Sequence, residues 1–598
     1  MKLFCLALIT ALSTVGCGSV PQSSRNPSTA AVDLRQPEGP SGLSEQTGWH
    51  GRKFAVATAH PLASAAGVEM LQAGGSAVDA AVAVQLVLTL VEPQSSGIGG
   101  GAFLLHHDGQ RTVAYDGRET APAAADETLF SKPDGTVMTF AEAVVGGRAV
   151  GVPGTLRLLE MAHGDHGRLP WARLFTPAIR LAEDGFPISR RLHALLAADP
   201  HLRQDPQARA YFYDRAGQPL PIGSHLRNPE LAAVLRRLAH DGVRAFYEGD
   251  MARAMVDKVQ QHPNNPGTLS LADLAAYRAI PRSPLCSVYA PKAVEAPRRY
   301  RICGFPPPGS GALAIAQILG LLERTPAPTL SFADPQWLHY YSEASRLAFA
   351  DRAQYLADPD FVMPPAGDWQ SLLAPAYLDS RARLIGPQTQ GIALAGNPTG
   401  EPQTLAAMPE QAEYGTSHFS IIDSHGNALA MTTTIEDAFG ARQMVNGYLL
   451  NNELTDFSFT ASDGHGRPVA NRLAPGKRPR SSMSPTLVFD DDSGELLFSG
   501  GSPGGAMIIH YTAKLLYALF HWQLTPQQAI DLPNFGSLNG PTLLEENRFA
   551  PEFVEALKSR GHQIREINLS SGLQAIDKTA RGYRGGADRR REGRVMGE

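Results

Sequence analysis

Apolar residues recur at helical spacing early in the chain and at strand spacing later. Residues 60–73 carry apolar side chains three and four positions apart, and two glycines end this predicted helix. Residues 78–91 are almost entirely apolar, which predicts a buried helix. Residues 416–422 alternate with period two, and 428–435 can pair with them around a polar turn. These patterns predict a mixed α/β protein with a buried hairpin.

Two further helix starts are marked by a capping residue followed by proline, at Asn228 and Asp334. Between the helical and hairpin regions, residues 386–414 revert to Gly, Pro, Gln and Thr. We expect this stretch to form a flexible tail that ends at Gly415. It leads directly into the predicted hairpin.

The first residues have the pattern of an export signal. Lys2 precedes a short apolar run, and a small residue stands before Cys17. We expect residues 1–17 to be a signal peptide of the lipoprotein type with Cys17 as the lipidated residue, although plain secretion stays open. Residues 18–48 are rich in Ser, Pro and Gly and are expected to be a flexible tether. The protein is thus expected to be exported to a bacterial periplasm, possibly as an outer-membrane lipoprotein.

Composition narrows the function further. The 598 residues are 43% hydrophobic and carry 53 basic against 58 acidic side chains, a net charge of −5. Such a chain has no basic excess to neutralise a phosphate backbone, so we expect no nucleic-acid partner. No later apolar run is long enough for a membrane span, so a lipid anchor is the only membrane contact expected.

Cys286 and Cys303 flank two short predicted strands. An even pair in an exported chain favours a disulfide, which would stabilise the fold by about 3 kcal/mol, and two free buried thiols are the alternative. No CxxC or HExxH pattern occurs, so we expect no metal site.

The junction between the polar tail and the hairpin reads Gly415-Thr416. It is either an ordinary linker or a self-cleavage site, at which the Thr416 hydroxyl attacks the Gly415 carbonyl. Cleavage would leave Thr416 with a free α-amine. Such an amine titrates near neutral pH and can serve as the base for its own hydroxyl.

Motifs spread over residues 50–598 bear on this choice. Together they resemble, in order, the motifs of the gamma-glutamyltransferase (gamma-glutamyltranspeptidase) family. They are GGSAVDAA (74–81), PQSSGIGGG (93–101), RETAP (118–122), GVPG (151–154), RLAFAD (346–351), TSHFS (416–420), TTTIE (432–436), LLNNELTDFS (449–458), RPRSSMSP (478–485) and GSPGG (501–505).

The resemblance implies a four-layer αββα sandwich of the N-terminal nucleophile hydrolase type. It also implies self-cleavage between Gly415 and Thr416 into a large subunit (49–415, with the tail 386–415) and a small catalytic subunit (416–598). The two subunits then pair as a heterodimer. Thr416 attacks a γ-glutamyl amide, such as that of glutathione, and water or an amino acid resolves the acyl-enzyme. No cofactor is implied.

The resemblance also assigns roles to residues. The Thr434 hydroxyl would support the oxygen of the nucleophile, and the backbone N–H groups of Gly504 and Gly505 would form the oxyanion hole. Residues that would bind the substrate are Arg118, Ser481 and Ser482 for the α-carboxylate, and Asp456, Glu453 and Glu436 for the α-amino group. Glu436 stands where the family more often has Asn, so the pocket is unusually acidic.

Other interpretations stay open. The same fold hosts acylases for glutaryl-cephalosporins or poly-γ-glutamate, and an exported binding protein could retain it without catalysis. The GxSxG pattern around Ser502 suggests a nucleophile elbow, but Pro503 lacks the N–H group that an elbow requires.

Overall fold

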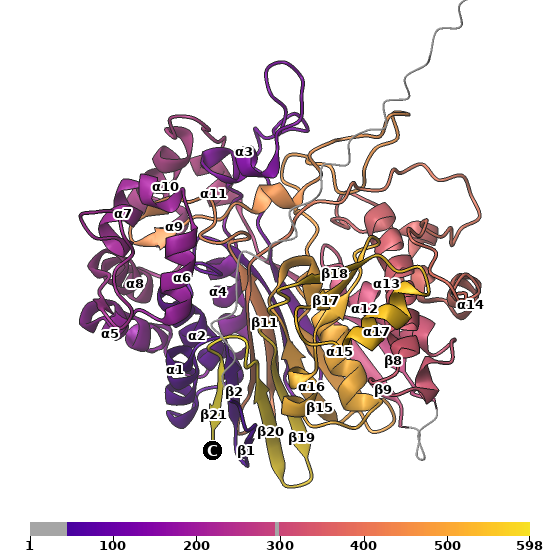
Figure 1. The fold of residues 1–598 in the computed structure, drawn as a ribbon. Helices are drawn as coiled ribbons and strands as arrows, with labels where there is room; N and C mark the ends of the chain where they lie inside the picture. The colour runs from indigo at the N-terminus through magenta and orange to yellow at the C-terminus, as the bar shows by residue number, and fades with distance from the viewer. Residues whose placement is uncertain (1–44, 293–297) are drawn as a thin grey trace, which may run out of the picture. The chain divides into compact units, whose positions relative to one another are not determined.

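Two seven-stranded β-sheets lie face to face in the computed structural model, which describes residues 45–292 and 298–598 (Figure 1). In both sheets all neighbouring strands are antiparallel. The first sheet has the order β1 (Trp49–Gly51), β20 (Gly582–Ala587), β19 (Gln574–Thr579), β15 (Leu496–Gly501), β14 (Thr486–Asp490), β9 (Tyr300–Gly304) and β8 (Leu285–Tyr289). The second has the order β21 (Arg594–Gly597), β2 (Ala55–Thr58), β10 (Ser417–Ile422), β11 (Ala428–Thr434), β3 (Gly101–His107), β4 (Thr112–Gly117) and β7 (Ile280–Arg282).

Side chains from the inner faces of both sheets form one apolar core, in which the Phe103 and Phe305 rings stack 3.8 Å apart. The outer face of each sheet is covered by helices (Figure 1). On the second sheet these include α1 (Pro61–Gln72), α2 (Ala77–Val91), α4 (Thr155–His166), α5 (Thr176–Asp184), α8 (Pro229–Asp241) and α10 (Asp250–Gln260). On the first sheet they include α12 (Gly311–Leu322), α13 (Pro335–Tyr355), α15 (Ile508–Phe520) and α17 (Pro551–Lys558). The expected four-layer αββα sandwich is confirmed.

The elements predicted from patterning are present. Asn228 and Asp334 cap α8 and α13 through their side chains, and α2 starts with a capping box between Ser76 and Asp79. Every residue of α2 is buried, because the helix packs on the second sheet beneath α1, α4 and α5. The predicted hairpin forms β10 and β11, the central pair of strands in that sheet.

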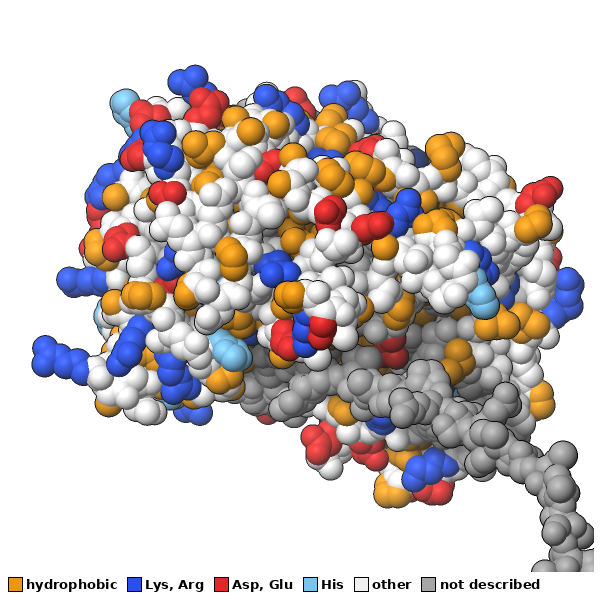
Figure 2. All heavy atoms as spheres, turned by 90° about the horizontal axis from the view of Figure 1, so that it is seen from above, with side chains coloured by type: hydrophobic (Ala, Val, Ile, Leu, Met, Phe, Trp, Pro, Cys, Tyr) orange, Lys and Arg blue, Asp and Glu red, His pale blue; other side chains and the backbone are white. Residues whose placement is uncertain are grey.

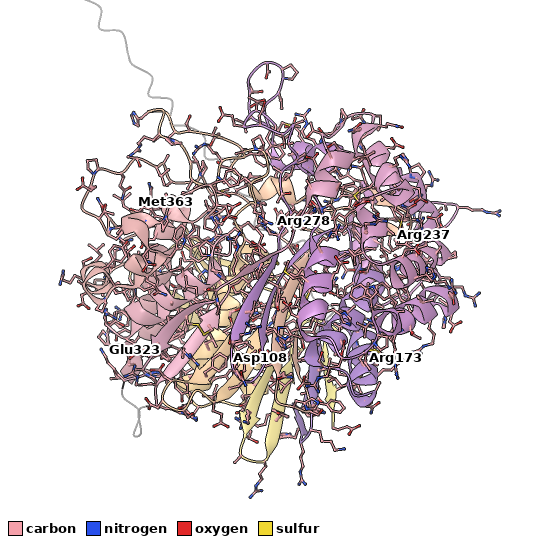
Figure 3. The ribbon with its side chains drawn as sticks, turned by 180° about the vertical axis from the view of Figure 1, so that it is seen from behind. Asp108, Arg173, Arg237, Arg278, Glu323 and Met363 are labelled. Atoms are coloured by element: carbon pink, nitrogen blue, oxygen red, sulfur yellow. A yellow bond between two sulfur atoms is a disulfide. The ribbon has the colours of Figure 1, made fainter. Side chains whose placement is uncertain are left out.

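A disulfide joins Cys286 and Cys303, as expected from the sequence (Figure 3). The two residues stand directly opposite each other in the register of β8 and β9, so their side chains leave the same face of the sheet. The bond therefore fixes the edge hairpin of the first sheet.

The expected signal peptide 1–17, with Cys17, lies outside the described residues, as does the expected tether up to residue 44. No helix within the described part of the chain combines the length and apolar character needed to cross a bilayer. On the face drawn in Figure 2, the described Lys and Arg side chains are scattered among Asp and Glu rather than gathered in one patch.

The tail 386–415 contains neither helix nor strand between α14 (Pro375–Ala382) and β10. Hydrogen bonds hold it to the body of the protein at several points. Arg346 donates to the Gly391 carbonyl, and the Met408 N–H donates to the carbonyl of Ala353. The tail thus follows a defined path to the hairpin.

Candidate active site at the start of strand β10

The strand register brings the two predicted threonines together. Ser417 pairs with Thr433 across β10 and β11, so Thr416, one residue before β10, lies beside Thr434 at the end of β11. Both hydroxyl-bearing residues are buried. Opposite them, Gly504 and Gly505 follow strand β15 of the first sheet. The candidate nucleophile therefore sits between the ends of two facing sheets.

In the uncut chain, one hydrogen bond is made to each of the two residues that the Gly415–Thr416 peptide bond joins. The Thr434 hydroxyl donates to the Gly415 carbonyl oxygen at 2.7 Å. The Gly504 N–H group donates to Thr416 Oγ1 at 3.0 Å. The family resemblance assigned Thr434 to the oxygen of the nucleophile. Here its hydroxyl contacts the carbonyl instead, because the peptide bond is intact and Gly415 still lies within its reach.

The two glycines take conformations and contacts that a side chain would not allow. Gly504 and Gly505 have φ values of +130° and +56°. A Cβ atom on Gly505 would lie 2.0 Å from the Glu413 carbonyl oxygen, so the tail passes directly over this turn. The turn leads through a short 3-10 helix (Gly505–Met507) into α15.

Arg118, one residue after β4, forms the centre of a fully buried ion cluster. Its guanidinium donates to the Glu453 carboxylate and, at 2.5 Å, to Asp456. Two further bonds go to the backbone carbonyls of Pro479 and Arg480. The two acids predicted to bind an ammonium group are thus paired with the arginine predicted to bind a carboxylate.

Burial shapes the ionisation of these acids. The pKa values of Glu453 and Asp456 lie well above their usual range because both carboxyls are desolvated, an effect that Arg118 only partly offsets. One oxygen of each, Glu453 Oε2 and Asp456 Oδ1, has no hydrogen-bond partner among the described residues. These two oxygens remain open to a donor from a bound molecule.

Glu436, two residues beyond Thr434, lines one cavity together with Arg118, Glu453 and Asp456. Its carboxyl accepts a hydrogen bond from the Tyr414 N–H group at 3.1 Å and another from the Asn452 side chain. Its backbone adopts a left-handed conformation with φ of +75°, which is rare for a residue with a side chain. Burial, and then the nearby Asp456, raise its pKa well above the ordinary value.

Ser482 is bonded to residues other than Arg118 in the uncut chain. Its hydroxyl bonds to the carboxylate of Glu413 and accepts a hydrogen bond from Arg352 at 2.6 Å. The neighbouring Ser481 hydroxyl accepts a bond from the Met483 N–H group at 3.2 Å. The Ser482 site is therefore occupied by a side chain of the tail.

Sequence reasoning missed this occupant, Glu413, and the two arginines that hold it, Arg352 and Arg480. Arg352 donates to both carboxylate oxygens at 2.8 and 3.0 Å, and Arg480 donates at 3.3 Å. Signals were present, since Arg352 directly follows the RLAFAD motif and Arg480 lies within RPRSSMSP.

One cavity gathers these groups, and the tail nearly fills it. About 20 Å³ remains, enough for about one water molecule. Every residue predicted for catalysis, cleavage or substrate binding except Gly504 lines it: Arg118, Gly415, Thr416, Thr434, Glu436, Glu453, Asp456, Ser481, Ser482 and Gly505. Glu413, Tyr414, Met483 and Ile508 complete the lining.

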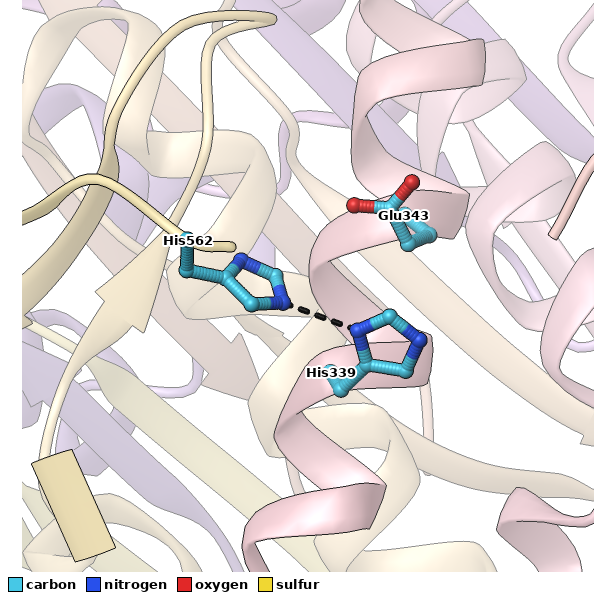
Figure 4. A group of neighbouring side chains, drawn as sticks. All are labelled: His339, Glu343 and His562. Atoms are coloured by element: carbon cyan, nitrogen blue, oxygen red, sulfur yellow. Dashed lines mark hydrogen bonds between the residues drawn. The ribbon is translucent and has the colours of Figure 1, made fainter. Parts of the chain in front are cut away.

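A separate cluster has side chains of the metal-binding type. His339, Glu343 and His562 lie together between α13 and the loop after α17 (Figure 4). His339 and His562 bond to each other at 2.8 Å, while Glu343 accepts bonds from Arg346 and from Thr389. The facing ring nitrogens and the carboxylate are thus already partnered, and the cluster acts as a hydrogen-bond network linking helix to tail.

Ser502, the alternative nucleophile, is fully buried. Its hydroxyl donates to the Pro503 carbonyl oxygen at 2.8 Å and accepts a bond from the Gly572 N–H group. It faces a structural turn rather than the cavity, which disfavours a nucleophile elbow.

Known proteins share this fold and this chain length. The family description Gamma-glutamyltranspeptidase matches residues 63–598. A glutathione hydrolase proenzyme of Bacillus subtilis (strain 168) is 34% identical over 561 residues, which cover 92% of each chain. An acylase ACY 1 proenzyme of Pseudomonas sp. (strain V22) is 35% identical over 88% of this chain and 90% of its own.

Among solved structures, a cephalosporin acylase from Bacillus halodurans aligns over 97% of this chain and 99% of its own, with a TM-score of 0.78 and 26% identity. The four layers, with a threonine at the entry of a central strand, are those of an N-terminal nucleophile hydrolase. Within that class, this chain belongs to the gamma-glutamyltranspeptidase family.

Proposed function

We propose that the chain is a proenzyme that cleaves itself between Gly415 and Thr416 and then acts on γ-glutamyl amides. The observation that carries the proposal is the pair of hydrogen bonds at this peptide bond, from Thr434 to the carbonyl and from Gly504 to the hydroxyl oxygen. A donor on the carbonyl oxygen stabilises the negative charge that develops there when a nucleophile attacks.

In the cleavage step, Thr416 Oγ1 attacks the Gly415 carbonyl carbon. The C–N bond breaks, an ester forms, and the Thr416 nitrogen takes up the hydroxyl proton. Water then hydrolyses the ester, which leaves a carboxylate on Gly415 and restores the hydroxyl. The product is a heterodimer of residues 49–415 and 416–598.

In turnover, the freed α-amine of Thr416 acts as general base for its own hydroxyl, since such amines titrate near pH 8. The hydroxyl attacks the γ-carbonyl of the donor, the amine leaves, and water or an amino acid releases the γ-glutamyl group. In this proposal the N–H groups of Gly504 and Gly505 bind the oxyanion, and the bond from the Gly504 N–H group to Thr416 Oγ1 supports the placement of Gly504. Glutathione is the donor we propose, and no cofactor is needed.

The test is a denaturing gel combined with an assay. Purified protein should show a fragment of roughly 20 kDa from the 64.0 kDa chain, with Thr416 at its N-terminus. Thr416→Ala should stay a single band and be inactive. A fully active protein that remains uncut would overturn the proposal, and so would a cut protein that releases nothing from γ-glutamyl anilides.

A second candidate is an acylase that takes glutaryl groups, which carry a carboxylate but no ammonium group. One observation favours it: Glu453 and Asp456, the expected ammonium ligands, are paired with Arg118. The acylase relatives are about as similar to this chain as the glutathione hydrolases. Parallel assays with γ-glutamyl and glutaryl anilides separate the two candidates by their ratio of kcat/KM.

We also propose that the protein is exported through residues 1–17 and anchored by a lipid on Cys17, on the sequence pattern alone. Incorporation of labelled fatty acid, lost in Cys17→Ser, tests the anchor.

A further inference from the structure

The residue that follows Thr416 is bonded from the helix side of the second sheet. Ser417 is fully buried, and its hydroxyl donates to the Glu92 carboxylate at 3.1 Å and accepts a bond from the Ser96 hydroxyl at 3.2 Å. Phe419, two residues further along β10, packs in the core formed with α2. Because side chains alternate along a strand, Ser417 points toward the same helix layer.

Both partners of Ser417 belong to the turn 92–96, which connects α2 to the segment before β3. The Glu92 carbonyl accepts bonds from the N–H groups of Ser95 and Ser96, at 2.9 and 3.2 Å. The second oxygen of the Glu92 carboxylate accepts a bond from the buried guanidinium of Arg191. The fold therefore fixes the turn and the carboxylate from several sides.

The same turn also binds the residue that follows the second threonine of the site. Ile435 comes directly after Thr434, and its N–H group donates to the Ser95 carbonyl at 3.3 Å. One turn thus contacts the next residue of each threonine. The spacing between Thr416 and Thr434 depends on both contacts.

The contact to Ser417 gains importance once the chain is cut. Strand pairing of β10 with β11 begins at Ser417, whereas pairing with β2 begins only at Phe419. After the proposed cleavage Thr416 is a chain end, and chain ends fray unless they are tied down. The Ser417 hydroxyl ties down the adjoining residue, and its partners Glu92 and Ser96 belong to the other piece of the cut protein.

We propose that the turn 92–96 holds Thr416 in place for its reaction by way of Ser417, with Glu92 and Ser96 as positioning residues. The inference rests on the proposed function and deepens it. These side chains touch no reacting atom, and they set where Thr416 Oγ1 lies relative to the acyl carbon. A misplacement of about 1 Å can cost about 100-fold in rate, so losing the contact lowers kcat and leaves KM nearly unchanged.

The central test removes only the hydroxyl, in Ser417→Ala. With a γ-glutamyl anilide, kcat of the cleaved variant should fall by about 10-fold and KM should stay within about twofold of the wild type. Self-cleavage should slow by a similar factor, because it uses the same Thr416 hydroxyl. Ser417→Thr keeps a hydroxyl and should recover most of both rates. An unchanged kcat in Ser417→Ala would overturn the inference.

A double-mutant cycle asks whether Glu92 acts through Ser417. Glu92→Gln keeps an oxygen for the Ser417 hydroxyl but removes the charge, so kcat should fall by about threefold. In the Ser417→Ala background the same change should have no further effect on kcat. The lost ion pair with Arg191 lowers stability in both backgrounds alike, so a purely structural role cannot give this pattern. Effects on kcat that simply multiply would overturn the role of Glu92.

Ser64→Ala is the matched control. Ser64 is also a fully buried serine whose hydroxyl makes two bonds, to the Thr58 hydroxyl and to the Arg594 carbonyl. Removing that hydroxyl should leave kcat at the wild-type value. An equal fall of kcat in Ser64→Ala and Ser417→Ala would mean that any lost buried bond slows the enzyme, and would overturn the inference.

Hydrogen exchange tests the contact without relying on activity. In Ser417→Ala the first amides of β10 should exchange about 10-fold faster than in the wild type, since the strand end then opens more often. Unchanged exchange would overturn the inference. If Ser417→Ala does not fold, Ser96→Ala removes one of the two bonds and should shift exchange and kcat in the same direction by less. Failure of the proposed function looks different: the wild type would stay uncut or cleave no γ-glutamyl anilide, and exchange in the uncut chain would still test the contact.

Discussion

Two arginine sites are paired with acids that line the same cavity, and they differ in which segment of the chain supplies the acid. Arg118 is paired with Glu453 and Asp456, both in the short 3-10 helix Glu453–Asp456 of the folded body. Arg352 and Arg480 are paired with Glu413, which lies in the tail just before the candidate cleavage point. The first pairing lasts as long as the fold does. The second lasts only while the tail stays in place.

The comparison teaches that one buried charge can be balanced within the folded body while another is balanced by a segment next to a cleavage point. A buried guanidinium needs a counter-charge, since desolvation of an unpaired ion costs several kcal/mol. At Arg118 the fold provides that charge permanently. At Arg352 and Arg480 the counter-charge is on Glu413 of the tail, so the charge balance there depends on the position of the tail.

The largest expected effect comes from removing Arg118 from its ion pairs with Glu453 and Asp456. Arg118→Met leaves Glu453 and Asp456 buried together without their cation, which should destabilise the protein by about 3–5 kcal/mol. Urea unfolding should show this loss both in the cleaved protein and in an uncut Thr416→Ala background. The exposed Arg173 (labelled in Figure 3) gives a matched control, since Arg173→Met should change little. A loss confined to the uncut protein would contradict the comparison.

A smaller, state-dependent effect is expected at Glu413. In the uncut Thr416→Ala background, Glu413→Gln removes the charge but keeps an amide against Arg352 and Arg480. The uncut chain should lose about 1–3 kcal/mol of stability in thermal or urea unfolding. If cleavage lets the tail move away from Arg352 and Arg480, the cleaved protein should lose nothing. Equal losses in both states would mean that Glu413 stays bound after cleavage.

The smallest expected effect is on the pH dependence of KM, and it concerns Glu436. Glu436 has a raised pKa, so it is neutral below that value and becomes an anion as the pH rises through it. The new charge then repels the carboxylate of a donor, and KM should rise with pH. Glu436→Asn should flatten this rise and leave self-cleavage nearly unchanged, as measured by pH profiles of kcat/KM. A profile identical to that of the wild type would remove Glu436 from donor binding.

Much of this architecture could be predicted before any coordinates. Alternation in residues 416–435 predicted the hairpin, and its register alone places Thr416 beside Thr434. The family motifs led to the four layers and to ten of the fourteen residues that line the cavity. Two cysteines flanking short strands predicted the disulfide.

The pairing of Glu413 with Arg352 and Arg480 could not be predicted, for a physical reason. Glu413, Arg352 and Arg480 come from the tail, from helix α13 and from the loop before β14, and no local periodicity links such distant segments. One hint existed, because Arg352 is a charged residue in a helix that is buried almost throughout and so requires a partner. The contact of Thr434 with the Gly415 carbonyl was missed because the family role describes a nucleophile that is already free.

The order of strands has a consequence for the cut protein. Residues before Gly415 supply β2, β3, β4 and β7 to the second sheet and β1, β8 and β9 to the first, and residues after Thr416 supply the rest. The hairpin β10–β11 is inserted between β2 and β3, while β9 lies against β14 and β1 against β20. Pulling the two pieces apart would unzip backbone hydrogen bonds within both sheets and expose unpaired strand edges to water. The disulfide lies wholly within the first piece, so reducing agents should not release either piece. The strand pairing between the two pieces keeps the cleaved protein together.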